Sequence, residues 1–200
     1  MTTRAGTGSG KAGAVRRGRG WVALALLVLT ALVTTAAGCG GGAAVRVDCD
    51  YGYAKDALSF RLSASPDLNL YNNQPHTVVL VFYALSDPNA FNQLLESSDG
   101  IGRLLEGKRF DASALSPRQI VVQPGEKKEL VMDRVQGTRY VGVVGGFYNQ
   151  QAQSFSRLYT VPTTKLTTLF GKEKACVTEP LAVDLELGSD GFVGPGEARP

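Results

Sequence analysis

Apolar and polar residues alternate along two stretches of the chain, which is the pattern of strands that bury one face. Residues 58–62 (LSFRL) and 181–187 (LAVDLEL) show this alternation. Residues 77–85 (TVVLVFYAL) form a continuous apolar and β-branched run instead, which predicts a central strand. A further strand is expected over residues 45–51.

Two pairs of shorter apolar runs each flank a turn, and we expect each pair to form a hairpin. The runs are residues 120–123 and 129–132 around Pro124-Gly125-Glu126, and residues 139–148 and 155–161 around Asn149-Gln150-Gln151. In the first turn the Pro presets φ and the Gly tolerates a positive φ, so the segment favours a chain reversal.

The pattern changes in residues 88–106, where apolar residues recur at spacings of three and four. They are Phe91, Leu94, Leu95, Ile101, Leu104 and Leu105. This spacing predicts a short helical insertion, broken near Asp99-Gly100. Six to eight strands with short turns indicate a mainly β fold, a β-sandwich over residues 45–187 that carries the insertion. Residues 188–200 are rich in Gly, Pro and charge and are expected to form a flexible tail.

The first 38 residues have the order of a secretory signal peptide. Five basic residues and no acid precede an apolar run over residues 21–33, and small residues follow as far as Gly38. A membrane-spanning anchor is the alternative, because residues 21–37 number 17, just short of the roughly 18 to 20 that cross a bilayer. The Cys placed directly after Ala-Ala-Gly favours the cleaved peptide over residues 1–38.

Ala36-Ala37-Gly38-Cys39 resembles a bacterial lipobox, in which a peptidase cuts just before a Cys that carries fatty acids such as palmitate. The resemblance implies lipidation of Cys39, with residues 39–44 as the lipidated Cys and a flexible Gly-rich linker. The lipobox favours Leu where Ala36 stands, so a plain cleaved signal and an uncleaved anchor stay open. Gly40 replaces the Asp that retains many Gram-negative lipoproteins at the inner membrane, which points to the outer membrane.

The basic character of the chain belongs to this leader. The full chain has 21 Lys and Arg against 18 Asp and Glu, and without residues 1–38 the balance is 16 against 18, a formal charge of −2. A nucleic-acid-binding domain needs clustered basic residues on its folded part, so no nucleic-acid partner is predicted. The remaining 162 residues suffice for one domain with a hydrophobic core.

Two cysteines remain besides Cys39. Cys49 and Cys176 form an even pair in a compartment where disulfides persist, so we expect a bond between them. Two unpaired buried thiols, or a catalytic Cys176, are the alternatives. A catalytic role has little support, because no triad motif surrounds either cysteine and the one histidine, His76, lies in an expected loop.

The sequence also lacks the groups that an enzyme brings together. It has no G-x-S-x-G, HExxH or P-loop motif, and a single histidine makes no His-based metal cluster. Asp184 and Glu186 share one strand face, which is ordinary for an exposed acidic face. We therefore predict no catalytic residue, no metal and no cofactor.

Five segments, in this order and spacing, resemble the outer-membrane lipoprotein of the type VI secretion system, the TssJ (SciN) family. They are residues 62–69 (LSASPDLN), 78–85 (VVLVFYAL), Phe91-x-x-Leu94 with Leu104-Leu105, 122–126 (VQPGE) and 140–147 (YVGVVGGF). The resemblance implies a transthyretin-like β-sandwich with a helical insertion. It also implies a lipid-anchored periplasmic protein, without chemistry of its own, that binds the periplasmic C-terminal region of TssM within the TssJ–TssL–TssM membrane complex. A lipoprotein that binds a small ligand or glycan through its sandwich loops, and an envelope enzyme, are the other classes considered.

The loop over residues 65–74 (SPDLNLYNNQ) is the candidate partner-binding segment. Its Pro, Asp and Asn residues are turn formers, yet it also carries apolar and aromatic side chains. These side chains either fold back over the end of the sandwich or stay exposed for a partner. The family's loop between its first two strands is implied in TssM binding, which makes Leu68, Leu70 and Tyr71 the expected anchors, with Asn69 and Asn72 shaping the loop.

Overall fold

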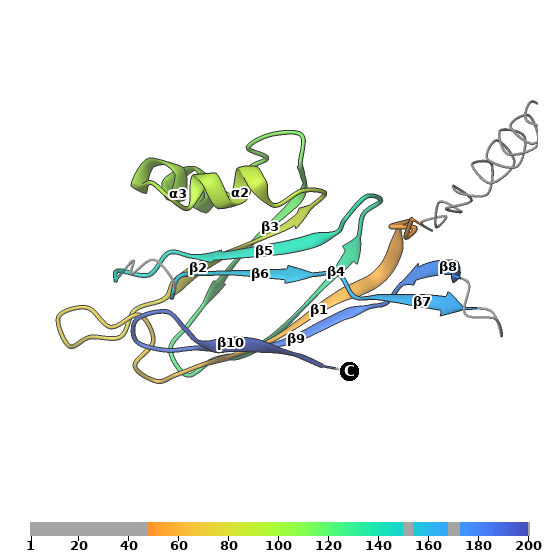
Figure 1. Cartoon of the computed structure of the whole chain (residues 1–200). Helices are drawn as coiled ribbons and strands as arrows, with labels where there is room; N and C mark the ends of the chain where they lie inside the picture. Colours follow the sequence, from red (N-terminus) through yellow and green to blue (C-terminus); the bar gives the residue numbers. More distant parts are fainter. Residues whose placement is uncertain (1–47, 150–153, 168–172, 200) are drawn as a thin grey trace, which may run out of the picture. The chain divides into compact units, whose positions relative to one another are not determined.

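The computed structural model describes residues 48–149, 154–167 and 173–199. The expected signal peptide, Cys39 and the linker lie outside these residues. The described residues form two four-stranded sheets packed face to face, with two short helices and an extra hairpin (Figure 1). The predicted mainly β sandwich is therefore confirmed.

The first sheet, named here the β1 sheet, is built around its longest strand. From edge to edge it contains β10 (Phe192–Arg199), β9 (Leu181–Leu187), β1 (Ala54–Ala64) and β4 (Lys127–Arg134). Strand β1 pairs in parallel with β9 and antiparallel with β4, so Leu58 lies beside both Leu181 and Met132. The alternation predicted for residues 58–62 and 181–187 is confirmed, because their large apolar residues are buried and the residues between them reach solvent.

The second sheet, the β2 sheet, is wholly antiparallel. It contains β3 (Ala114–Val122), β2 (Val78–Leu85), β5 (Tyr140–Gly145) and β6 (Ser156–Thr160), in that order. Strand β2 is central, as its continuous apolar run predicted, and β5 pairs with β6 as the second expected hairpin.

The first expected hairpin is wrong, because β3 and β4 belong to different sheets. The turn after Gln123 carries the chain across the sandwich. Gly125 has a φ of +72°, and its N–H donates to the carbonyl of Ser65 at 3.0 Å, which ties the turn to the end of β1. The Pro-Gly turn was located correctly, but a turn signal does not say which strands pair.

The two faces of β2 are covered by different layers. Phe82 points between the sheets, where its ring lies 4.8 Å from that of Phe60 on β1. Tyr83 points to the opposite face and meets Phe91 and Phe110, whose ring centres lie 6.1 and 5.3 Å away. Burial raises the pKa of Tyr83 to about 12. Its hydroxyl therefore stays protonated and donates to the carbonyl of Leu104 at 2.6 Å.

Two helices cover this outer face of the β2 sheet (Figure 1). They are α2 (Asn89–Leu94) and α3 (Ser98–Leu105). The helical insertion is confirmed, but the break lies before Ser98 and not near Asp99-Gly100. The hydroxyl of Ser97 accepts the N–H of Gly100 at 3.1 Å and so caps α3. A side chain at Gly100 would collide with the carbonyl of Leu94, so glycine lets the first turn of α3 lie against the end of α2.

Both open sides of the sandwich are held by a long basic side chain. On one side, Arg157 of β6 donates from Nη2 to the carbonyl of Phe192 at 2.9 Å and from Nε to that of Gly194 at 3.0 Å. On the other side, Lys128 of β4 donates to the carbonyl of Val121 on β3 at 2.7 Å. These contacts occupy carbonyl groups that unpaired edge strands would otherwise present to solvent.

The C-terminal segment corrects another expectation. Residues 192–199 are not a flexible tail, because they form β10, which pairs with β9 on the edge of the β1 sheet. Gly194 and Gly196 have positive φ values where the register of the pair shifts. The two glycines allow the strand to continue through this irregularity, so they do not end it.

A hairpin outside the two sheets was not predicted. It consists of β7 (Thr163–Thr167) and β8 (Glu173–Thr178). Cys176 on β8 is bonded to Cys49, with the two Cα atoms 4.5 Å apart and a sequence separation of 127. In the described part of the expected strand 45–51, Asp50 forms only an isolated bridge to Val177.

Replacing Gly142 by Ala should destabilise the sandwich. Gly142 on β5 lies under the ring of Phe91, and an added Cβ would approach that ring to 2.8 Å. Overpacking of this kind costs about 1 to 3 kcal/mol. Gly102→Ala is the matched control, since the position is an exposed helical site with no atom within 4 Å of the new Cβ. Urea unfolding of both variants checks this, and equal midpoints would contradict the packing of α2 on β5.

Removal of the disulfide should lower the free energy of unfolding. In the chain-entropy model, a closed loop of more than 100 residues contributes at most about 4 to 5 kcal/mol. We expect a Cys49→Ala, Cys176→Ala double variant of residues 45–200 to unfold at lower denaturant than the oxidised parent, and the reduced parent to resemble the variant. Thiol titration of the unreduced parent in denaturant is the direct check, and two free thiols there would rule out the bond.

Candidate functional site

The loop between β1 and β2 (residues 65–77) forms one end of the sandwich, named here the loop end. The loop enters next to β9, because the N–H of Ser65 donates to the carbonyl of Leu187 at 2.8 Å. It leaves into β2, and on the way the N–H of His76 donates to the carbonyl of Leu68 at 2.9 Å. The loop therefore folds back on itself above the sheets.

Leu68 and Asn69 do not have the exposure expected of partner contacts. Leu68 is fully buried and belongs to the main core cluster, and Asn69 is only 2% exposed. The expectation that Leu68 is an anchor for a partner is therefore wrong. Leu68 instead packs into the end of the hydrophobic core. This is the alternative stated for the loop, in which its apolar side chains fold back over the end of the sandwich.

Asn69 holds three loops together. Its side-chain amide donates to the carbonyl of Thr77 at 3.0 Å, and its side-chain oxygen accepts the N–H of Tyr148 at 2.8 Å. Its own N–H donates to the carbonyl of Gly188 at 3.2 Å. The residue has a φ of 48°, a left-handed conformation that Asn tolerates better than most residues. The loops after β1, β5 and β9 are thus fixed to one residue, through its side chain and its backbone N–H.

The tip of the loop is a tight reversal. Tyr71 and Gln74 exchange backbone hydrogen bonds of 2.9 and 3.0 Å, and the two residues between them, Asn72 and Asn73, have φ values of 50° and 59°. Two successive positive φ values are typical of the type I′ turn, which favours Asn. Leu70, half-buried, is tied to the β9–β10 turn because its N–H donates to the carbonyl of Ser189 at 2.9 Å.

Three rings form an aromatic cluster on this support. Tyr71 stacks on Tyr148 with ring centres 4.6 Å apart and planes 19° apart. His76 meets Tyr148 edge-on at 5.1 Å. The two tyrosines are 51% and 56% exposed, so part of each ring faces solvent and can contact a partner. Sequence reasoning missed Tyr148 and His76 as members, because Tyr148 lies 77 residues from Tyr71 and follows a different strand.

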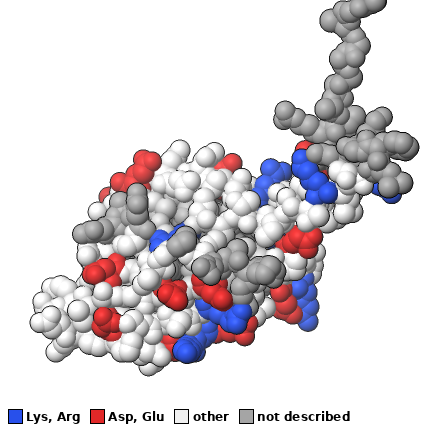
Figure 2. Space-filling model, turned by 60° about the horizontal axis from the view of Figure 1, so that its bottom comes forward, with Lys and Arg blue, Asp and Glu red and all other residues white. Residues whose placement is uncertain are grey.

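The loop end carries little charge. Figure 2 shows this end, on the left, as mostly white with a few acidic atoms. The acids nearby are engaged locally: Asp67 accepts the hydroxyl of Ser65, and Asp190 accepts the amide of Asn149 at 3.3 Å. The surface therefore suits an apolar or aromatic contact with a polar rim.

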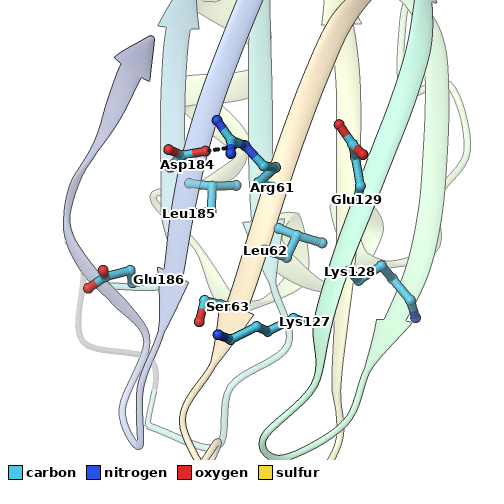
Figure 3. A pocket seen from close by; sticks show the side chains of 9 residues that line it. All are labelled: Arg61, Leu62, Ser63, Lys127, Lys128, Glu129, Asp184, Leu185 and Glu186. Atoms are coloured by element: carbon cyan, nitrogen blue, oxygen red, sulfur yellow. Dashed lines mark ion pairs between the residues drawn. The ribbon is translucent and has the colours of Figure 1, made fainter.

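A shallow groove lies elsewhere, on the outer face of the β1 sheet (Figure 3). Side chains of β9, β1 and β4 line it, and Arg61 pairs with Asp184 at 3.1 Å with both side chains about half exposed. Such pairs contribute little stability. The arrangement is a solvated strand surface with mixed charges, as expected for Asp184 and Glu186, and it lies on strands and not on the sandwich loops.

Within the described ranges, no three His, Cys, Asp or Glu residues gather where they could hold a metal ion. Over the same residues, neither α2 nor α3 has the length and apolar character that a membrane span requires.

The described strands match known protein structures. Crystalline TssJ1 from Pseudomonas aeruginosa aligns with a TM-score of 0.52 at 19% identity, over 74% of this chain and 97% of that one. The Serratia marcescens protein Lip, described as a membrane-bound component of the type VI secretion system, aligns with a TM-score of 0.51 at 16% identity, over 72% and 96%. A chain in a structure described as the TssM C-terminal domain (869–1107) from EAEC gives 0.50 at 14% identity, over 72% and 97%.

At identities this low, the structural alignments establish the fold alone. It is the transthyretin-like β-sandwich that the sequence resemblance implied. No curated relative matches the chain. The family model described as type VI secretion lipoprotein (VasD, EvfM, TssJ) matches residues 56–189, two thirds of the chain. The chain therefore belongs to the family of type VI secretion lipoproteins.

Proposed function

We propose that this protein is a structural component of the type VI secretion membrane complex, anchored to the outer membrane by a lipid on Cys39, with its sandwich facing the periplasm. Its role is to bind the periplasmic C-terminal region of TssM, within an assembly that also includes TssL. The observation that carries the binding proposal is the exposed Tyr71–Tyr148 pair at the loop end.

The pair has the properties of an interface hot spot. Tyrosines are enriched among residues that dominate binding energy, because each offers a large apolar face and a polar tip. Their backbone is already fixed by Asn69 and by the reversal at Asn72, so little conformational freedom is left to lose on binding. Leu70 adds apolar area beside them, while Leu68 and Asn69 act from below as support.

The positions of anchor and loop also suit an adaptor between a membrane and a partner. Strand β1 has 11 residues, about 35 Å at 3.3 Å per residue. Cys49 precedes its start and the loop follows its end, so the two lie at opposite ends of the sandwich (Figure 1). A lipid on Cys39 thus leaves the loop end free to face away from the bilayer.

A small ligand or glycan remains the second candidate, because an exposed pair of tyrosine rings can also stack on a sugar. A ligand site normally surrounds its ligand and adds converging polar groups. The two tyrosines are 51% and 56% exposed, and the groove of Figure 3 lies on the outer face of the β1 sheet, away from them. A protein partner therefore fits this surface better.

Cys39→Ser should abolish anchoring by the lipid. Without the thiol no diacylglyceryl group can be attached, so the variant should be found as soluble periplasmic protein or as uncleaved precursor. Stable anchoring requires more than one acyl chain, each contributing about 0.8 kcal/mol per buried methylene. Mass spectrometry of the wild-type N-terminal peptide should show an acylated Cys39. An unmodified mature N-terminus at another residue would contradict the lipid anchor.

Tyr71→Ala and Tyr148→Ala should each weaken binding to the periplasmic C-terminal region of TssM by at least about 1 to 2 kcal/mol, the range of hot-spot truncations. Calorimetric titration measures this. The melting temperature should change little, since both rings are half exposed. Tyr53→Ala is the matched control, because Tyr53 is 61% exposed but precedes β1 at the opposite end.

Leu68→Ala distinguishes a residue that stabilises the fold of the loop from residues that contact the partner. Truncation of a fully buried leucine costs about 2 to 5 kcal/mol of folding stability, so this variant should lose stability much more than the tyrosine variants do. If neither tyrosine variant binds more weakly than Tyr53→Ala, the interface lies elsewhere.

A further inference from the structure

The β7–β8 hairpin extends from the sandwich at the end opposite the loop end. Its base is closed by a hydrogen bond from the N–H of Glu179 to the carbonyl of Pro162 at 2.8 Å. All of β7 is exposed. A two-stranded hairpin is marginally stable by itself, and the bond from Cys176 to Cys49 helps to hold it, together with the bridge from Asp50 to Val177.

The two faces of this hairpin differ. In the antiparallel register, Thr164 lies opposite Val177 and Leu166 lies opposite Ala175, so these four share one face, named here the apolar hairpin face. None of the four is charged, and Leu166 and Val177 are 48% and 40% exposed. The exposed Asp50 borders this face, because it forms a parallel bridge to Val177. Cys176 and Lys165 lie on the other face, where the chain from Cys49 arrives.

The length of chain before the hairpin indicates what covers this face. Ten residues separate Cys39 from Cys49, and at about 3.3 to 3.6 Å per residue they span no more than about 35 Å. A lipid on Cys39 would therefore keep the disulfide, and the hairpin with it, within that distance of the bilayer. Tethering makes a second contact with the same surface intramolecular, so even a small apolar face can dock.

We propose that the apolar hairpin face docks on the phospholipid surface of the membrane that holds the lipid anchor. The inference rests on the proposed lipidation of Cys39 and adds a second point of membrane contact. Leu166 and Val177 enter the boundary between headgroups and acyl chains, where apolar side chains of peripheral proteins bury. Two points of contact fix the orientation of the sandwich and turn the loop end away from the bilayer.

Tryptophan fluorescence tests this directly, because the sole tryptophan of the chain, Trp21, lies in the leader. Leu166→Trp is placed in the mature, acylated protein and reconstituted into vesicles of phosphatidylethanolamine and phosphatidylglycerol. Val131→Trp is the matched control, since Val131 is 47% exposed on the outer face of β4. Val177→Trp repeats the test on the neighbouring strand if Leu166→Trp does not fold.

Docking predicts a blue-shifted emission for Leu166→Trp and quenching by brominated acyl chains, with neither effect for Val131→Trp. If Cys39 is acylated by mass spectrometry and the Leu166→Trp and Val131→Trp emissions respond alike, the hairpin contact is overturned and the anchor stands. A blue shift that needs no vesicles and grows with protein concentration shows a second copy on this face and also overturns the proposal. An unacylated Cys39 overturns the anchor and this inference together.

Discussion

The parallel pairing of β1 with β9 is the constraint on which the rest of this structure depends. Because the two strands run in the same direction, the segments before them lie at one end of the sandwich and those after them at the other. Cys49 and the β7–β8 hairpin precede them, and the loop with Tyr71 and the turn with Ser189 follow. This pairing therefore separates the end nearest the proposed lipid from the end that presents the aromatic cluster. The contact between Phe60 on β1 and Phe82 on β2 packs the second sheet against the first.

The loop end combines a buried half with an exposed half, and each depends on the other. Leu68 fills the core and Asn69 uses both ends of its amide, so the backbone beneath Tyr71 cannot shift without loss of packing and hydrogen bonds. Rigid support of this kind lets two half-exposed rings stay stacked without a partner. Within one loop, Leu68 therefore packs into the core, while Tyr71 stays exposed on the surface.

Local pattern allowed much of the fold to be predicted, and nonlocal contacts explain what it missed. Alternation identified β1 and β9, and the apolar run identified β2, because each depends only on which face is buried. Strands β3 and β4 pair with different sheets, and the turn between them is tied to the end of β1 by the Gly125–Ser65 hydrogen bond, a nonlocal contact that no local pattern encodes. Strand β10 was missed because its glycines indicate a tail until β9 supplies a partner.

For the candidate site too, the local pattern predicted some features, and the others depend on nonlocal contacts. The sequence placed Tyr71 on an exposed loop, but it could not distinguish Leu68 from Leu70, since burial there depends on the register of the whole loop. Tyr148 joins the site only because β5 ends beside β2.

The proposed anchor at one end and the proposed partner at the other would determine how the fold carries load. A pull between a lipid on Cys39 and a partner on Tyr71 runs along β1, because Cys49 precedes that strand and the loop follows it. Because β1 is already extended between these two points, its covalent backbone would carry the tension, and its hydrogen bonds to β9 and β4 hold the strand in the sandwich. The disulfide directs part of the same load through Cys176 into β8 and on to β9, the neighbour of β1. Two adjacent parallel strands would then share the tension, which suits the proposed link between a membrane and a partner protein.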